Sequence, residues 1–338
     1  MVYIIAEIGC NHNGDFNLAK KMVDVAVSCG VDAVKFQTFK ADLLISKYAP
    51  KAEYQKATTG EADSQLEMTR RLELSFDEYL ELRDYCSEKG VDVFSTPFDM
   101  ESLDFLISTD MPVYKIPSGE ITNLPYLEKI GQQGKKVILS TGMAVMDEIH
   151  QAVKTLQENG TSDISILHCT TEYPTPYEAL NLNVLHTLKQ EFPDLTIGYS
   201  DHSIGSEVPI AAAAMGAELI EKHFTLDNDM PGPDHKASAT PDILAALVKG
   251  VRIVEKSLGK FEKEPEEVEV RNKIVARKSI VAKTPIKKGD VFTEENITVK
   301  RPGNGISPME WYNVLGQVSE HDFDVDQNIR HSQFANQL

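Results

Sequence analysis

The feature that most constrains the fold of this chain is the alternation of short β-rich runs with amphipathic helical stretches up to about residue 255. Such alternation is typical of βα units with a parallel sheet. Eight runs can be counted, reading YIIAEIG, AVKFQTF, VDVFSTPF, VYKIPSGE, KKVILSTGM, ISILHCTTEYP, LTIGYSDHS and AELIEKHFT. Eight repeats predict a closed (β/α)₈ barrel of the TIM type rather than an open, doubly wound sheet.

The helical stretches carry signals for their ends. In SFDEYLELRDYCSEKG, Ser75 can cap the first turn, Glu78 stands at the capping-box position and Gly90 can end the helix. Gly30 can end the stretch NLAKKMVDVAVSCG in the same way. These local signals agree with the predicted barrel.

Two segments interrupt the repeat. The polar stretch from about 40 to 75 is longer than an ordinary βα connection, so we expect a flap beside the active site. The charged run GKFEKEPEEVEVRNK ends the repeat, and the short β-branched runs and turns after it predict a small β-rich domain. The predicted organisation is a barrel over 1–257, a linker over 258–274 and a C-terminal domain over 275–338.

Composition limits the class of function. A formal charge of −18 without a sustained basic face opposes nucleic-acid binding. No apolar run approaches the roughly 20 residues of a membrane span, and the N-terminus lacks the features of a signal peptide. Cys10, Cys29, Cys86 and Cys169 form no CxxC pair, which argues against a zinc ribbon or a disulfide framework. We therefore expect a cytoplasmic protein with neither a nucleic-acid nor a membrane partner.

Polar side chains stand at or just past the predicted strand ends, where a TIM barrel places its catalytic groups. A single charged residue after a strand is best explained as a solvated loop position. A convergence of many such positions favours an active site. The residues are Glu7, Lys35, Thr96, Lys115, Ser118, Glu120, Ser140, His202, Glu221 and His223.

Two lysines and three hydroxyls of this set predict a binding site for a phosphate and a carboxylate. Ammonium groups and hydroxyls supply the charge and the donors that such anions require. A buried lysine could instead form a Schiff base, which leaves an ordinary aldolase as an alternative. The residues concerned are Lys35, Thr96, Lys115, Ser118 and Ser140.

Two histidines predict a metal site. His202 in SDHS and His223 in EKHFT end the seventh and eighth predicted strands, which are neighbours in a closed barrel. A lone histidine is more often a hydrogen-bonded core residue, but two imidazoles with water and a substrate carbonyl suit a catalytic ion. Glu120, directly after a strand, is a candidate general acid or base, with a salt bridge to the lysines as the alternative.

At these motifs the chain resembles the sialic acid synthase family, which includes neuraminate, legionaminate and pseudaminate synthases. The resemblance covers essentially the whole chain and rests on AEIGCNHNGD, VKFQT, STPFD, KIPSGEITNLPYL, LSTGM, HCTTEYPTP, GYSDHS, EKHFTLD and GPDHKAS, in that order. The tail KTPIKKGDVFTEENITVKRPGNGI resembles the family's antifreeze-like domain, also called the SAF domain, of the β-clip type. The resemblance implies a domain-swapped homodimer, in which this domain caps the barrel of the partner subunit.

The resemblance also implies a reaction. Phosphoenolpyruvate condenses with the open-chain aldehyde of an N-acetylmannosamine-like sugar: its C3 attacks the aldehyde, water adds at C2, and phosphate leaves by C–O cleavage. The implied roles are phosphoenolpyruvate binding by Lys35, Thr96, Lys115, Ser118 and Ser140, binding of Mn²⁺ or Mg²⁺ by His202 and His223, and proton handling by Glu120. The expected sugar contacts are Glu7, Thr171, Tyr173, Glu221, Asp234 and Arg301.

One departure bears on the acceptor sugar. Thr171 and Glu172 stand beside Tyr173 where the neuraminate type has Asn and Leu. The variant looks more like legionaminate synthases, whose aldehyde is 2,4-diacetamido-2,4,6-trideoxymannose, and N-acetylmannosamine is the alternative. A pseudaminate synthase is a further alternative. A heptulosonate-type synthase is a less favoured one, because it would need extra cations for a second phosphate. A noncatalytic ice- or carbohydrate-binding protein is a different class, against which the strand-end residues argue.

Overall fold

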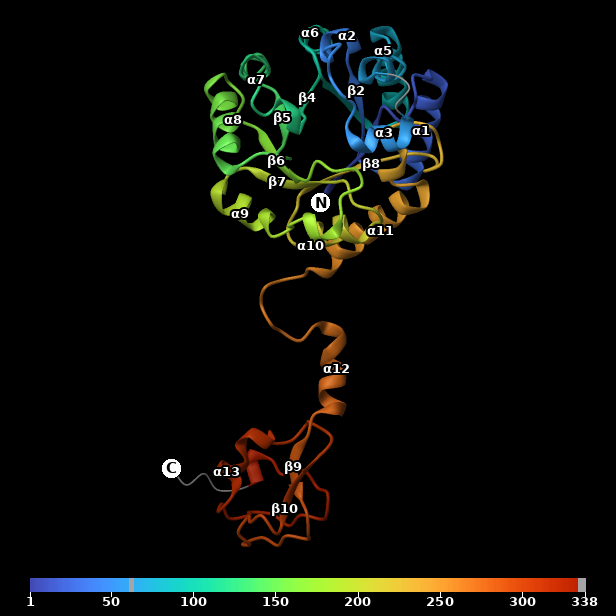
Figure 1. The fold of residues 1–338 in the computed structure, drawn as a ribbon. Coiled ribbons are helices and arrows are strands. Elements are labelled where there is room, and N and C mark those ends of the chain that lie inside the picture. The colour runs from blue at the N-terminus through green and yellow to red at the C-terminus, as the bar shows by residue number, and fades with distance from the viewer. Residues whose placement is uncertain (61–63, 334–338) are drawn as a thin grey trace. The chain divides into compact units, whose positions relative to one another are not determined.

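The first compact unit of the molecule is an eight-stranded barrel. The computed structural model describes residues 1–60 and 64–333, and the chain divides into the units Met1–Gly259 and Lys260–Leu338. In the first unit, parallel strands pair in the order β3-β2-β1-β8-β7-β6-β5-β4, and β3 also contacts β4, which confirms the predicted barrel (Figure 1). The strands are β1 (Tyr3–Gly9), β2 (Ala33–Thr38), β3 (Asp92–Pro97), β4 (Val113–Ile116), β5 (Lys136–Ser140), β6 (Ile164–Cys169), β7 (Thr196–Asp201) and β8 (Leu219–His223).

Helices surround this barrel and begin and end at the predicted signals. Ser75 Oγ accepts from the backbone N–H of Glu78, whose carboxylate accepts in return from the N–H of Ser75, and Gly90 ends that helix with a φ of 71°. None of the helices in the described ranges combines the length and the apolar character that a bilayer crossing needs. The surrounding helices are α1 (Phe16–Cys29), α5 (Phe76–Lys89), α6 (Met100–Ser108), α7 (Leu124–Gly131), α8 (Met146–Glu158), α9 (Val184–Glu191), α10 (Glu207–Ala214) and α11 (Pro241–Ser257).

Alternation along the strands separates the core from the barrel interior. Successive side chains of a strand point to opposite faces, so Glu221 and His223 of β8 share one face and Ile220 and Lys222 the other. The outward faces pack under the helices in one apolar core, to which Ile4, Ala6, Ile8, Val34, Phe36 and Ile220 belong. Parallel strands covered in this way are buried on both sides, which leaves the interior positions for polar groups at the strand ends.

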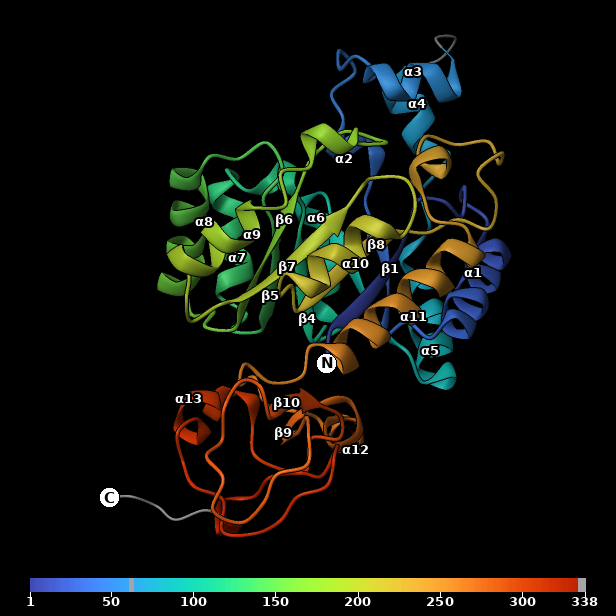
Figure 2. The ribbon, with the colours of Figure 1, turned by 90° about the horizontal axis from the view of Figure 1, so that it is seen from below.

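The long segment between β2 and α5, which was predicted as a flap, is partly helical. It forms the short helices α2 (Ala41–Leu44), α3 (Glu53–Thr59) and α4 (Gln65–Arg70), and Figure 2 shows α3 and α4 apart from the ring of barrel helices. Ser64 caps α4, since its Oγ accepts from the backbone N–H of Glu67 at 3.2 Å. The insertion therefore has defined faces of its own.

The second compact unit is small and β-rich, as predicted for the tail. Strands β9 (Ser279–Ala282) and β10 (Ile297–Lys300) are antiparallel, and Ile280, Phe292 and Phe323 are among the residues of its own apolar core. The short helix α13 (Trp311–Val314) closes against that core through buried Val314. Part of the expected linker is helical, because α12 (Glu267–Ala276) forms there with every residue exposed.

Candidate functional site

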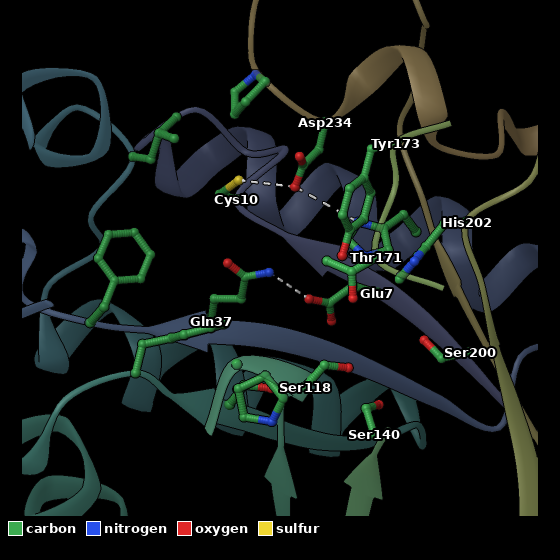
Figure 3. A pocket seen from close by; sticks show the side chains of 18 of the residues that line it. Glu7, Cys10, Gln37, Ser118, Ser140, Thr171, Tyr173, Ser200, His202 and Asp234 are labelled. Carbon is green, nitrogen blue, oxygen red and sulfur yellow. Dashed lines mark hydrogen bonds and ion pairs between the residues drawn. The ribbon is translucent and has the colours of Figure 1, made fainter. Parts of the chain in front are cut away.

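A cavity of about 500 Å³ lies at the carboxyl ends of the barrel strands. Its volume falls in the range of small-molecule sites. Figure 3 shows side chains from several strand ends converging on it. Its lining includes most of the residues expected at the site, namely Glu7, Lys35, Thr96, Lys115, Ser118, Ser140, Thr171, Tyr173, His202, Glu221, His223 and Asp234.

Four buried charged side chains, which we call the charged cluster, meet in this cavity: Glu7, Lys35, Lys115 and Glu221. Lys35 Nζ lies 2.6 Å from Glu7 Oε2 and 3.9 Å from Glu221 Oε1. Lys115 Nζ lies 3.3 Å from the same oxygen of Glu221. Each of the four residues is at most 3% exposed, so each charge depends on its partners instead of water.

Electrostatics within the charged cluster favour an ionised Glu221. Burial alone would raise the pKa of Glu221, but the ammonium groups of Lys115 and Lys35 lower it to about 2. Burial raises the pKa of Glu7, against the opposing effect of Lys35. Burial also lowers the pKa of Lys115, although Glu221 counteracts this shift. A bound anion would therefore meet ammonium groups that neighbouring carboxyl groups already hold in place.

Beside the charged cluster stands a group of hydroxyls, Ser118, Ser140 and Thr171, which we call the hydroxyl cradle. Ser140 Oγ and Thr171 Oγ1 are buried and have no hydrogen-bond partner within the described residues. Ser118 Oγ accepts from the backbone N–H of Gly142 at 2.8 Å. An ideal Cβ on Gly142 would lie 2.2 Å from Thr171 Oγ1, so the glycine permits this close approach. Buried polar atoms without partners indicate a polar ligand.

Two buried imidazoles lie edge to face at the cavity. The ring centroids of His202 and His223 lie 5.2 Å apart, and their planes cross at 78°. His202 Nδ1 lies 2.6 Å from the carbonyl oxygen of Thr170, which can only accept, so Nδ1 carries the proton and Nε2 keeps its lone pair. Burial lowers the pKa of both histidines, which favours the neutral form that ligates metals.

These residues fit a divalent ion that keeps exchangeable positions. The described part of the chain holds no cluster of three or more His, Cys, Asp or Glu arranged for a metal. The available protein ligands are thus the two imidazoles, with Asp234 Oδ2 3.8 Å from His223 Nδ1. A carbonyl that orients a ligating histidine, as Thr170 orients His202, is a common outer-shell feature of metal sites.

A buried ion pair supports the loop that carries His202. Lys222 Nζ donates to Asp201 Oδ2 at 2.5 Å and to the carbonyl oxygen of Ser203 at 2.6 Å. Asp201 Oδ1 accepts from the backbone N–H of Ser203 at 3.0 Å and from the Tyr199 hydroxyl at 3.1 Å. The residues on both sides of His202 are therefore fixed. This pair was not predicted from the sequence. A signal for it existed, because alternation along β8 places Lys222 on the face opposite to His223.

Further residues missed from the sequence complete the inner part of the cavity (Figure 3). Gln37 Nε2 donates to Glu7 Oε1 at 2.9 Å, and Gln37 lies two positions after Lys35 on the same face of β2. The Cys10 thiol donates to Asp234 Oδ2 at 3.6 Å, and burial raises the pKa of Asp234 to about 6. The inner cavity thus has more hydrogen-bonding capacity than its charged residues alone supply.

The outer part of the cavity comes from the helical insertion and has a different character. The Phe98 ring stands edge-on to that of Phe39, with centroids 6.5 Å apart. The sequence predicted this segment beside the active site but not which of its residues line the cavity, because short helices give no clear apolar stripe. The lining residues from this segment, which we call the outer wall, are Leu44, Ile45, Gln55, Gln65, Met68, Thr69 and Leu72. All seven are neutral.

Two expected site residues, Glu120 and Arg301, stay predictions. Glu120 ends the 3₁₀ turn η1 (Ser118–Glu120), and Asn123 Nδ2 donates to its carboxylate at 2.6 Å. It is not among the residues that line the cavity, and its role as a general acid or base stays a prediction. Arg301 belongs to the second unit, where its Nε donates to the carbonyl oxygen of Ala276 at 3.0 Å. Its role toward the sugar stays a prediction.

Comparisons with known proteins give a consistent relationship. The sequence profile of the NeuB family matches residues 22–263, and that of the SAF domain matches residues 277–335. The chain is 49% identical to the N,N'-diacetyllegionaminic acid synthase of Campylobacter jejuni, over 97% of this chain and 98% of that protein. It is 45% identical to the synthase of the same name from Legionella pneumophila, over 93% and 89%. The crystal structure of N-acetylneuraminic acid synthetase from Leptospira borgpetersenii in complex with citrate is 36% identical, with a TM-score of 0.70 over 80% of this chain and 90% of that one.

Proposed function

Because the chain belongs to the NeuB family and ends in a SAF domain, we propose that this enzyme is an N,N'-diacetyllegionaminate synthase. It joins phosphoenolpyruvate to 2,4-diacetamido-2,4,6-trideoxymannose and releases phosphate. The enzyme is a synthase of the sialic, legionaminic and pseudaminic acid group, which removes the aldolase and the noncatalytic alternatives. The observation that carries the choice of acceptor is the 49% identity with the Campylobacter jejuni enzyme along nearly the full length of both chains.

Phosphoenolpyruvate binding is assigned to the inner end of the cavity. The ammonium groups of Lys35 and Lys115 supply positive charge, and Thr96 Oγ1 lies 3.2 Å from Lys35 Nζ. Two hydroxyls of the hydroxyl cradle, those of Ser140 and Thr171, have no hydrogen-bond partner within the described residues. Charge-assisted hydrogen bonds of this kind are the strong ones in anion recognition. Thr171, which is expected to contact the sugar, lies at the edge of this anion site, since its hydroxyl lies over Gly142 beside Ser118.

Metal binding is assigned to His202 and His223. A bound Mn²⁺ or Mg²⁺ supplies Lewis-acid polarisation of the acceptor's aldehyde. The chain's own part is to keep both imidazoles neutral by burial and to orient His202 through the carbonyl of Thr170. The buried pair of Asp201 and Lys222 holds the loop in which His202 lies.

Sugar contacts are assigned to Glu7, Tyr173, Glu221 and Asp234, which surround the two imidazoles. The Tyr173 ring lies 4.3 Å from that of His202 and 5.6 Å from that of His223, centroid to centroid. This ring excludes water on one side of the reacting aldehyde. Carboxylate oxygens of Glu7 and Asp234 can accept hydrogen bonds from acceptor hydroxyls.

The SAF domain has a place in the same proposal. The enzyme forms a domain-swapped homodimer in the cytoplasm, and Arg301 of each SAF domain contacts the acetamido end of the sugar. The proposed domains are a barrel over 1–257, a linker over 258–274 and a SAF domain over 275–338. Support comes from the SAF match at 277–335 and from α12, whose exposed residues leave a surface free for such an arrangement.

Phosphate release tests the proposed function. Purified enzyme is given phosphoenolpyruvate and Mn²⁺ with either 2,4-diacetamido-2,4,6-trideoxymannose or N-acetylmannosamine, and kcat/KM is measured for each. We expect at least about a 10-fold preference for the diacetamido sugar, a difference that specific hydrogen bonds can supply. EDTA should abolish release and Mn²⁺ should restore it. A preference for N-acetylmannosamine would make the enzyme a neuraminate synthase, and release with neither sugar would refute both assignments.

A further inference from the structure

Two glutamines of the helical insertion form an amide pair at the cavity. Gln55 belongs to α3, Gln65 begins α4, and both side chains line the outer wall. Gln65 Nε2 donates to Gln55 Oε1 at 3.3 Å, and the backbone N–H of Ala52 donates to the same oxygen at 3.0 Å. Gln55 Nε2 and Gln65 Oε1 make no hydrogen bond to any described residue. The pair therefore offers the Nε2 donor of Gln55 and the Oε1 acceptor of Gln65, beside the second N–H of Gln65 Nε2.

Apolar side chains line the cavity together with this pair. Met68 and Leu72 are 4% and 8% exposed, and both line the cavity with half-buried Leu44. No member of the outer wall is charged, whereas the charged cluster lies at the strand ends. The buried cation nearby, Lys51, already donates to Thr59 Oγ1 and to the carbonyl oxygen of Gly60 and does not belong to the outer wall. A row of sugar hydroxyls would meet mostly carbon at Met68, Leu72 and Leu44. The chemistry that fits is a group with one carbonyl and one N–H, attached to an apolar neighbour.

We propose that the amide pair binds the acetamido group at carbon 4 of the acceptor and that Met68 and Leu72 contact its 6-methyl group. Gln55 Nε2 donates to the acetamido carbonyl, and Gln65 Oε1 accepts from the acetamido N–H. The aldehyde end of the sugar then faces the imidazoles, and its far carbons face α3 and α4. This assignment rests on the proposed function. It names the residues that would make the enzyme specific for the diacetamido sugar.

The pair would discriminate between the two acceptor sugars, because the wrong sugar leaves polar atoms of the pair without hydrogen bonds. N-acetylmannosamine carries a hydroxyl at carbon 4, which is too short to engage a donor and an acceptor on two different side chains. A site built to hydrogen-bond a substrate group rejects analogues that lack it, because its own polar atoms lose their partners. The neutral outer wall would also disfavour a phosphorylated sugar.

Replacement of the amides by isosteric thioethers tests the assignment. The double variant Gln55→Met/Gln65→Met is compared with wild type for kcat/KM with both sugars, for the KM of phosphoenolpyruvate and for Tm. We expect the ratio of the two kcat/KM values, diacetamido sugar over N-acetylmannosamine, to fall by about 10-fold or more. The change in the KM of phosphoenolpyruvate should be smaller. Gln157→Met, at an exposed position of α8, is the matched control and should keep the wild-type ratio.

The outcomes separate this inference from the proposed function. A wild-type preference for the diacetamido sugar that survives in the double variant would overturn the inference and leave the function standing. An equal loss with both sugars would also overturn it, because the pair would then have only a structural role. Turnover with neither sugar in the wild type would overturn both. If the double variant does not fold, the single variants Gln55→Met and Gln65→Met, each removing one of the two bonds, provide the same ratio.

Discussion

The inner and outer ends of the cavity differ in what holds their side chains in place. At the inner end, Lys35, Lys115 and Glu221 come from three barrel strands, and each is no more than 3% exposed. At the outer end, Gln55 and Gln65 come from helices of 7 and 6 residues outside the barrel's ring of helices. Helices this short gain little stability from their own hydrogen bonds. The difference suggests that reaction chemistry depends on the barrel, while choice of acceptor depends on an insertion that can change independently.

The largest effect should come from an inner-end ligand. His223→Ala should lower metal-dependent phosphate release at least about 1000-fold, because one imidazole cannot hold a catalytic ion. The barrel should stay folded, since the residue faces the cavity and not the core. Phosphate assays, Mn²⁺ binding by paramagnetic resonance and circular dichroism measure these effects. His186→Ala, on the exposed side of α9, is the control, and turnover at the wild-type rate in His223→Ala would contradict the ligand assignment.

The second-largest effect should come from the buried pair of Lys222 and Asp201, which supports the loop of His202. Lys222→Met leaves the carboxylate of Asp201 buried without its cation, and should lower the free energy of unfolding by about 3–5 kcal/mol. Metal affinity should fall about 10- to 100-fold, as for other supports of ligating histidines. Urea unfolding and Mn²⁺ titration measure the two effects. Lys222→Met/Asp201→Asn should recover part of the stability because the unpaired charge is gone; no recovery would mean that charge is not the cause.

The smallest effect should come from the outer wall. Leu72→Ala should cost about 2 kcal/mol of unfolding free energy, the lower limit for such substitutions, because one side of Leu72 already borders open space. The KM of the acceptor should rise about 10-fold and more than that of phosphoenolpyruvate. Urea unfolding and steady-state kinetics test both. Equal increases in the two KM values would argue that the two ends of the cavity are not independent.

The same contrast explains which parts of the site sequence analysis could predict. Strand ends obey a period of two and a known barrel geometry, so Lys35, Lys115 and His223 could be placed on the cavity from the sequence. Glu120 follows a strand as well, yet it ends a 3₁₀ turn whose side-chain directions the period of two does not give. The pairing of Gln55 with Gln65 depends on how two short helices pack, which no local pattern encodes. The place of a side chain in the site was therefore predictable where the backbone is regular. Where it is not, tertiary packing decides which side chains reach the cavity.

Gly142 has a consequence for attempts to redesign this enzyme. An added Cβ there would meet Thr171 Oγ1 at 2.2 Å and Ser118 Oγ at 2.8 Å, so positions 142 and 171 compete for one volume. A mutant library that varies position 171 and keeps Gly142 tests only side chains that fit into the space next to this glycine. Any larger residue at 142 first requires a smaller one at 171. Which variants of the hydroxyl cradle can be reached will therefore depend on the order of the mutational steps as well as on their sum.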